Sequence, residues 1–159
     1  MGLNWVEIDV KICKDLIPIL LHDDSLDRTT NGKGLPINFE YNSLKNLDAG
    51  YFFYNQNTKV YIPTLQDILI LSQKNNICLN IELKPNIGYE KENVKAIIKV
   101  IKKLNFNKEY YFSSFDLNSL IIMKEYFPDS KCGLLVETFN NNLSLIDILS
   151  LSKRYDFFS

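Results

Sequence analysis

"CLNIELKPNIGYEKENVKAIIKVIKKLNFNKEYYFSS", residues 78–114, decides the fold. It begins with an apolar strand, Cys78–Leu83, and ends with a second strand, Tyr110–Ser113. Between them, Glu92–Leu104 has the periodicity of a helix, with four apolar residues on one face: Val94, Ile97, Ile98 and Ile101. A strand, a helix and a strand in this order predict a parallel pair joined by a helical crossover.

The same alternation continues toward the C-terminus. Leu117–Phe127 is a predicted helix, which begins after the N-cap residue Asp116 and ends before Pro128. The remaining predicted elements are a strand at Lys131–Val136, a helix at Leu143–Lys153 and the start of a strand at Tyr155–Phe158. Such regular alternation is typical of an α/β fold in which helices cover a parallel sheet.

The N-terminal part has a different pattern. Val6–Val10 is a predicted strand and Ile17–Leu21 a short hairpin return, with the turn at Lys14-Asp15. A polar loop, Asp23–Asn38, follows, and the sequence stays irregular beyond it. We therefore expect residues 24–62 to form a loop insertion after the hairpin.

A helix is predicted to begin directly after this insertion. Thr64 has the character of an N-cap, because Asp67 stands three residues further on and apolar residues follow. Five aromatic side chains elsewhere are expected to pack in the core or between layers: Phe52, Phe53, Tyr54, Tyr111 and Phe112.

Length and composition limit the classes of protein. A chain of 159 residues with 46% hydrophobic residues is expected to form one domain with a core. Its net charge of −1 gives no basic surface for nucleic acid. Cys13, Cys78 and Cys132 lack metal-binding spacing and are expected to be reduced, mostly buried thiols. Reduced thiols favour a cytoplasmic protein. No transmembrane span and no signal peptide are recognisable in the sequence.

Two of the predicted strands carry charged residues near their ends. Side chains alternate along a strand, so Glu7 and Asp9 share one face, as do Glu82 and Lys84. Such groups are commonly solvated or paired with basic neighbours. We favour the alternative that the three carboxylates converge where strands end and bind a cation, Mg²⁺ or Ca²⁺, that offsets their repulsion. His22, the only histidine, follows the hairpin and could transfer protons there.

Five segments together resemble the glycerophosphodiester phosphodiesterase family. They are VEIDV (6–10), LLHDDSLDRTTNGKG (20–34), IPTLQDIL (62–69), NIELKP (80–85) and SSFD (113–116). The second is the most specific, because its HD, its RTT and its two glycines keep the spacing of the family. The resemblance implies a TIM-barrel fold and metal-dependent hydrolysis of small-molecule glycerophosphodiesters to sn-glycerol 3-phosphate and an alcohol.

The resemblance also implies roles for single residues. Glu7, Asp9 and Glu82 match the metal ligands of the family. Lys84 matches a lysine that holds a phosphate oxygen, and His22 matches one of two histidines that share acid–base catalysis. These roles agree with the chemistry, because a cation and a lysine offset charge that develops on phosphate and a histidine can protonate a leaving alkoxide.

Two further residues match the family with less specific implications. Arg28 stands in the RTT segment, where a structural role in the turn is favoured over contact with substrate. Phe115 follows Ser114 at the end of a predicted strand. It is expected either to line the mouth of the site or to pack in the core.

The sequence also departs from the family. The family pattern begins with a strand bearing H-R-G and a helix bearing E-N-T, and neither occurs here. We therefore expect residues 1–159 to be a partial domain, an incomplete TIM barrel of about five strands that starts at the family's second strand.

Such a chain is expected to have little phosphodiesterase activity alone. It would then be a non-catalytic remnant, or one part of a split enzyme that needs a complementary barrel fragment or self-association. A related phospholipase C-like or D-like barrel is a third alternative. The RTTNGKG and IPTL segments favour the glycerophosphodiesterase family over that one.

Overall fold

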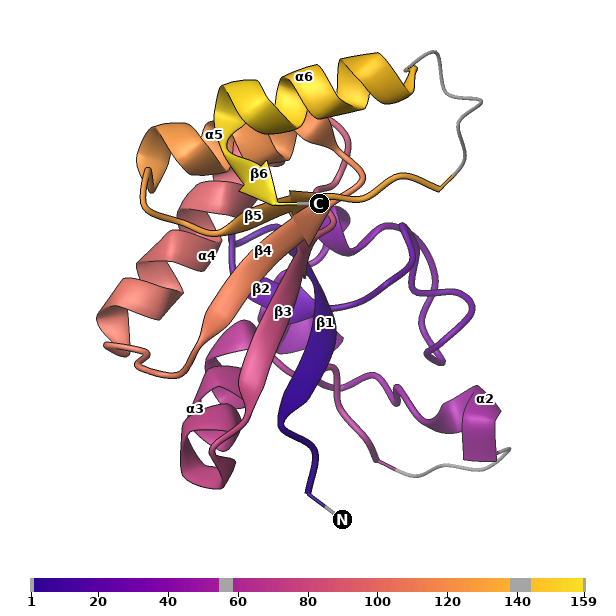
Figure 1. The fold of residues 1–159 in the computed structure, drawn as a ribbon. Coiled ribbons are helices and arrows are strands. Elements are labelled where there is room, and N and C mark those ends of the chain that lie inside the picture. The colour runs from indigo at the N-terminus through magenta and orange to yellow at the C-terminus, as the bar shows by residue number, and fades with distance from the viewer. Residues whose placement is uncertain (1, 55–58, 138–143, 159) are drawn as a thin grey trace.

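The computed structural model describes residues 2–54, 59–137 and 144–158, and its centre is a six-stranded sheet (Figure 1). The strands are β1 (Trp5–Ile12), β2 (Pro18–Leu20), β3 (Cys78–Leu83), β4 (Tyr110–Ser114), β5 (Cys132–Leu134) and β6 (Phe157–Phe158). Their order across the sheet is β2-β1-β3-β4-β5-β6. Strand β2 is antiparallel to β1, and all other neighbouring pairs are parallel. The α/β class with a mostly parallel sheet is thus confirmed, with six strands where about five were expected.

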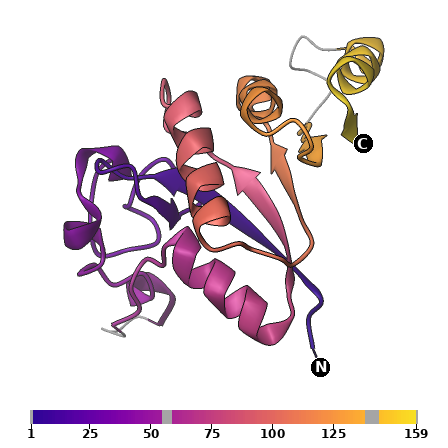
Figure 2. The same ribbon diagram turned by 90° about the vertical axis from the view of Figure 1, so that its left-hand side faces the viewer.

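Helices connect the parallel strands. The longer ones are α3 (Leu65–Asn75), α4 (Glu90–Lys103), α5 (Leu117–Tyr126) and α6 (Leu145–Tyr155). Between β2 and α3 the chain forms a 3₁₀ helix (Pro36–Asn38) and two short helices, α1 (Tyr41–Leu44) and α2 (Tyr51–Tyr54). Figure 2 shows α3, α4 and α5 along one side of the sheet, with the segment that carries α1 beyond the β2 edge. None of the helices in the described ranges has the length and hydrophobicity needed to span a bilayer.

The main core lies between the sheet and these helices. Alternate residues of β1 point into it, and Val10 and Ile12 are fully buried. Ile81 on β3 and Phe112 on β4 are fully buried on the same side. The apolar face of α4 packs against them, as its periodicity predicts: Val94, Ile97, Ile98 and Ile101. The alternating apolar residues of the strands and the apolar face of α4 therefore pack together in one core.

Local sequence signals account for the helix ends. Thr64 and Asp67 form a reciprocal capping box at the start of α3, and Asp116 accepts hydrogen bonds from the first turn of α5. Both predicted caps are confirmed. The strand predicted at Lys131–Val136 is shorter, Cys132–Leu134, and the predicted helix start at Leu143 lies outside the described residues.

Some aromatic residues were predicted incorrectly. Phe112 is fully buried, as expected, but Phe52, Phe53 and Tyr54 are 56%, 85% and 56% exposed. These three residues belong to α2, a four-residue helix without a buried residue. A single turn points side chains in all directions, so apolar content there does not imply burial.

The cysteines follow the prediction more closely. All three are free thiols, Cys13 and Cys132 are buried, and Cys78 is half-buried. Burial raises the pKa of the Cys13 thiol to about 12, with a further contribution from its hydrogen bond to Asp15. Cys13 is therefore an unreactive part of the smaller core beneath the hairpin.

Candidate metal-binding and catalytic site

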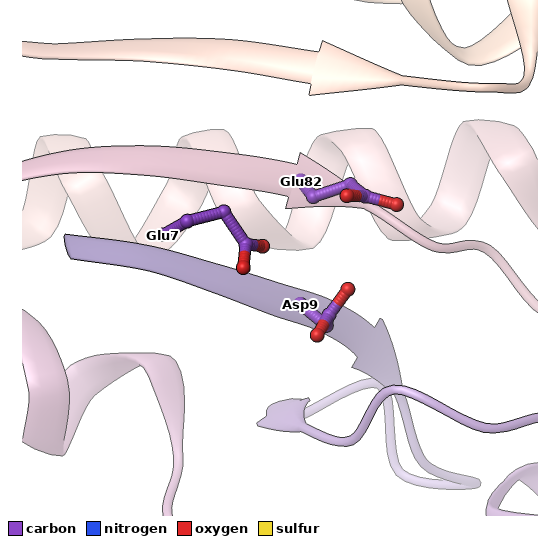
Figure 3. A group of neighbouring side chains, drawn as sticks. All are labelled: Glu7, Asp9 and Glu82. Atoms are coloured by element: carbon purple, nitrogen blue, oxygen red, sulfur yellow. The ribbon is translucent and has the colours of Figure 1, made fainter. Parts of the chain in front are cut away.

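Strand register brings the three predicted carboxylates together. Asp9 on β1 lies opposite Glu82 on β3, and Glu7 lies opposite Asn80, two residues earlier. One ligand oxygen from each of the three carboxylates lies within 4.8 Å of the others (Figure 3). All three alternate with core residues, so they occupy the face of the sheet that the helices leave open. The arrangement is that of a candidate site for a divalent cation with oxygen ligands.

Electrostatics support a cation at this position. Partial burial and the neighbouring carboxylates of Asp9 and Glu82 raise the pKa of Glu7, although its side chain remains exposed on the open face. Lys84 is the nearest protein counter-ion, with Nζ 3.3 Å from Glu82 Oε1 and 3.6 Å from Asp9 Oδ1. One ammonium group leaves the three carboxylates with excess negative charge. The residues present therefore fit a hard divalent cation such as Mg²⁺ or Ca²⁺.

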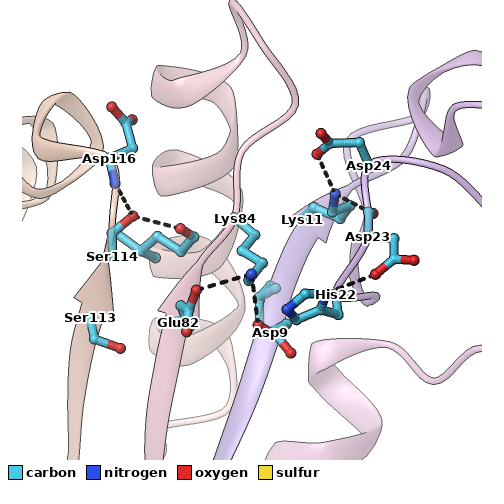
Figure 4. Close-up of polar contacts among 12 residues, drawn as sticks. Asp9, Lys11, His22, Asp23, Asp24, Glu82, Lys84, Ser113, Ser114 and Asp116 are labelled. Carbon is cyan, nitrogen blue, oxygen red and sulfur yellow. Dashed lines mark hydrogen bonds and ion pairs between the residues drawn. The ribbon is translucent and has the colours of Figure 1, made fainter. Parts of the chain in front are cut away.

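His22 lies beside this group and has a defined orientation (Figure 4). Its Nδ1 is 2.8 Å from Asp23 Oδ1, and Arg28 donates two hydrogen bonds to the same carboxylate, at 2.6 and 2.7 Å. These hydrogen bonds, first from Arg28 and then from His22, hold the pKa of Asp23 well below its usual range. An ionised carboxylate can only accept, so Nδ1 of His22 carries a proton and Nε2 is left for chemistry.

Lys11 is a residue of the site that sequence reasoning missed. Its side chain is fully buried, and Nζ donates to the Asp23 carbonyl at 2.5 Å and to Asp24 Oδ1 at 3.4 Å. Burial lowers the pKa of this ammonium group, and Asp24 opposes the effect. Through its hydrogen bond to the Asp23 carbonyl, Lys11 thus connects the end of β1 to the backbone next to His22. The sequence contains a signal for this residue, because Lys11 lies two residues after Asp9 and therefore shares a strand face with Glu7 and Asp9.

Two cavities border the site. One, of about 570 Å³, is lined by His22, Glu82, Lys84 and Phe115 among others. The second, of about 320 Å³, is lined by Glu7, Asp9 and His22 among others. Phe115 is 53% exposed, which favours the mouth of the site over the core for this residue. Arg28 lines neither cavity and is instead paired with Asp23.

The family model for "Glycerophosphoryl diester phosphodiesterase family" matches residues 1–156. The chain belongs to this family. It is 36% identical over 137 residues to a glycerophosphodiester phosphodiesterase of Caldanaerobacter subterraneus, covering 86% of this chain and 56% of that protein. A glycerophosphodiester phosphodiesterase of Bacillus altitudinis is 33% identical over 136 residues, covering 84% of this chain and 55% of that protein.

Solved structures of the family agree with the fold. A phosphodiesterase from Oleispira antarctica, in complex with the product sn-glycerol-3-phosphate, is 33% identical and superimposes with a TM-score of 0.88. The match covers 98% of this chain and 62% of that one. The chain thus spans just over half the length of the curated relatives it matches.

Proposed function

We propose that this chain supplies the metal site and one acid–base residue for hydrolysis of glycerophosphodiesters to sn-glycerol 3-phosphate and an alcohol. The observation that carries the proposal is the convergence of Glu7, Asp9 and Glu82 within 4.8 Å. The likeness to a phosphodiesterase that holds sn-glycerol-3-phosphate supports this substrate class.

In this proposal each residue has a separate task. Glu7, Asp9 and Glu82 hold one divalent cation, Mg²⁺ or Ca²⁺, which would polarise the phosphoryl oxygens. Lys84, whose Nζ is already beside the carboxylates, binds a phosphate oxygen and offsets developing charge. His22, oriented by Asp23, donates a proton from Nε2 to the leaving alkoxide. Phe115 contacts the substrate at the mouth of the cavity.

Arg28 has a supporting task rather than a direct one. Its guanidinium forms a bidentate pair with Asp23, and Arg28 itself lines neither cavity. By keeping Asp23 ionised, Arg28 fixes the orientation of the His22 ring. We propose that this is how the RTT segment contributes.

We also propose that further residues complete the active site. The 159 residues contain one histidine, whereas the family pattern implies two that share acid–base work. A complementary barrel segment or a second copy of the chain would supply the other. With His22 alone, activity is expected to be low, because removing one member of a catalytic set that acts together costs several orders of magnitude.

The surroundings of the site favour a small substrate in a reducing compartment. A net charge of −1 offers no basic footprint for nucleic acid. The three free cysteines support a cytoplasmic location.

The test is a direct product assay. Glycerophosphocholine is incubated with the purified chain and Mg²⁺ or Ca²⁺, alone and with a polypeptide that carries H-R-G and E-N-T segments of a family member. We expect sn-glycerol 3-phosphate to form chiefly in the combined sample, and His22→Ala to slow its formation by roughly 10²–10⁴-fold. Absence of product in both samples, or product that does not depend on His22, would overturn the proposal.

A further inference from the structure

A separate cavity lies on the helix-covered side of the sheet. Its volume is about 1030 Å³, at the upper end of the roughly 300–1,000 Å³ of small-molecule sites. The hairpin turn, α1, α3 and α4 all contribute lining residues, on the side of the molecule seen in Figure 2. It shares no lining residue with the two cavities that border the carboxylate site.

Cationic groups dominate the rim of this cavity. Five lysines line it: Lys45, Lys59, Lys95, Lys99 and Lys103. Of the three lining carboxylates, Asp15 and Asp67 accept hydrogen bonds from their own neighbourhood, Asp15 from the Tyr41 amide and Asp67 from Thr64. Among the residues that the structure describes, no ion pair involves any of the five lysines. Lys95 Nζ lies 4.7 Å from the centre of the Tyr126 ring, and Lys103 Nζ donates to Gln66 at 3.5 Å. The rim therefore suits an anion with more than one charge.

The remaining lining is apolar. Leu16 and Tyr61 are 46% and 51% exposed, and Pro18 and Val100 extend the same surface. A cavity lined by both exposed apolar groups and lysines would bind a ligand that has both an apolar and an anionic part.

Backbone conformation singles out the same place. Across the described ranges, five residues other than glycine have positive φ, and three of them are Asn or Asp, which tolerate it: Asn76, Asn105 and Asp156. The other two are Leu16 (φ 59°) and Lys59 (φ 58°), and both line this cavity. Turn hydrogen bonds between Cys13 and Leu16, and from the Lys59 amide to Asp48, hold these conformations. Such costly conformations at residues other than Asn, Asp or Gly concentrate at functional sites.

We propose that this cavity binds an amphiphilic phosphate monoester, a single apolar chain that ends in a dianionic phosphate. The phosphate lies between the ammonium groups of Lys45 and Lys99, and the chain lies against Leu16 and Tyr61. A ligand with a dianionic phosphate can interact with several ammonium groups at once, and therefore binds them more strongly than a ligand with a single carboxylate. The inference does not rest on the proposed hydrolysis, because the two sites share no residue.

Calorimetry with three probes distinguishes the contribution of the phosphate head group from that of the apolar chain of the ligand. These are dodecyl phosphate below its critical micelle concentration, inorganic phosphate, and dodecyl maltoside, which has the chain without the charge. We expect dodecyl phosphate to bind with a Kd at least tenfold lower than either of the others. Equal affinity for dodecyl phosphate and dodecyl maltoside would show that the phosphate does not contribute to binding, and would overturn the proposal. So would binding that appears only above the micelle concentration.

Three variants locate the binding. Leu16→Gly removes the exposed side chain from a conformation that glycine adopts freely, so the thermal midpoint should stay unchanged or rise. Affinity for dodecyl phosphate should fall about tenfold while that for inorganic phosphate stays the same. Lys99→Gln should weaken binding of both phosphates, whereas Lys74→Gln, an exposed lysine of α3 outside the cavity, should not.

A variant of the carboxylate site provides the last control. Lys84→Gln alters the other anion-binding candidate and should leave dodecyl phosphate affinity unchanged. If Lys84→Gln weakens binding and Lys99→Gln does not, the ligand occupies the carboxylate site and the proposal is wrong.

Discussion

The two faces of the sheet are built from the same strands but differ in composition, and near the start of β1 they also differ in burial. On the face beneath the helices, Val10, Ile81 and Phe112 are fully buried. On the open face, Glu7 is exposed and Trp5 is 43% exposed, although both lie on the strand that carries Val10. Because side chains alternate along a strand, every second residue of β1 packs in the core, and the residues between them are available for the site. Substitutions on the buried face should therefore chiefly lower stability, and those on the open face should chiefly alter catalysis or cation binding.

The largest expected effect is on catalysis by the open face. In any active assembly, His22→Ala should slow hydrolysis of glycerophosphocholine by roughly 10²–10⁴-fold, because its leaving alkoxide needs a proton. An activated aryl phosphodiester, whose leaving group needs little protonation, should be slowed much less. The thermal midpoint should not change, because the His22 side chain is 59% exposed. Equal losses on both substrates would indicate a structural role for His22.

Next in size is a loss of stability on the buried face. Phe112→Ala should lower the free energy of unfolding by about 3–5 kcal/mol, because Phe112 is fully buried in the main core. Trp5→Ala on the open face, which removes a ring contact with Tyr111 at 5.4 Å, should cost no more than about 1 kcal/mol. Urea unfolding monitored by circular dichroism measures both. Similar costs for the two variants would remove the distinction between the faces.

The smallest expected effect is an increase in stability, on substitution of Glu7. Because the pKa of Glu7 is raised in the folded protein, its ionised form destabilises the fold as pH rises above the unfolded value of about 4.3. With a chelator present, Glu7→Gln should therefore increase stability at pH 7, by less than about 1 kcal/mol since solvent screens this exposed group. The gain should vanish at about pH 3, well below the unfolded value, where Glu7 is protonated in both states. A gain that persists at that pH would mean that charge repulsion is not its cause.

The sequence predicted those parts of the molecule that depend on periodicity and on local capping. Alternation along β1 placed Glu7 and Asp9 on one face of that strand, and Thr64 with Asp67 predicted the start of α3. These features depend on neighbours one to four residues apart, so the sequence contains them directly.

Features that depend on long-range contacts could not be predicted in the same way. That Arg28 pairs with Asp23 instead of lining a cavity depends on how the loop after the hairpin folds back. Leu16 adopts a conformation that its residue type disfavours, because hydrogen bonds of the turn impose it. The exposed aromatic residues of α2 were mistaken for core because hydrophobicity alone does not reveal which residues find packing partners.

The central claim is that the three carboxylates of the open face form one cation site. Calorimetric titration of the full chain with Mg²⁺ and with Ca²⁺ tests it directly, with Glu82→Gln compared with Glu109→Gln, a surface glutamate paired with Lys131. We predict one saturable site for the wild type and for Glu109→Gln, and an affinity at least ~10-fold weaker for Glu82→Gln. Equal affinities for all three proteins, or no binding of either cation, would contradict the assignment of Glu7, Asp9 and Glu82 as ligands.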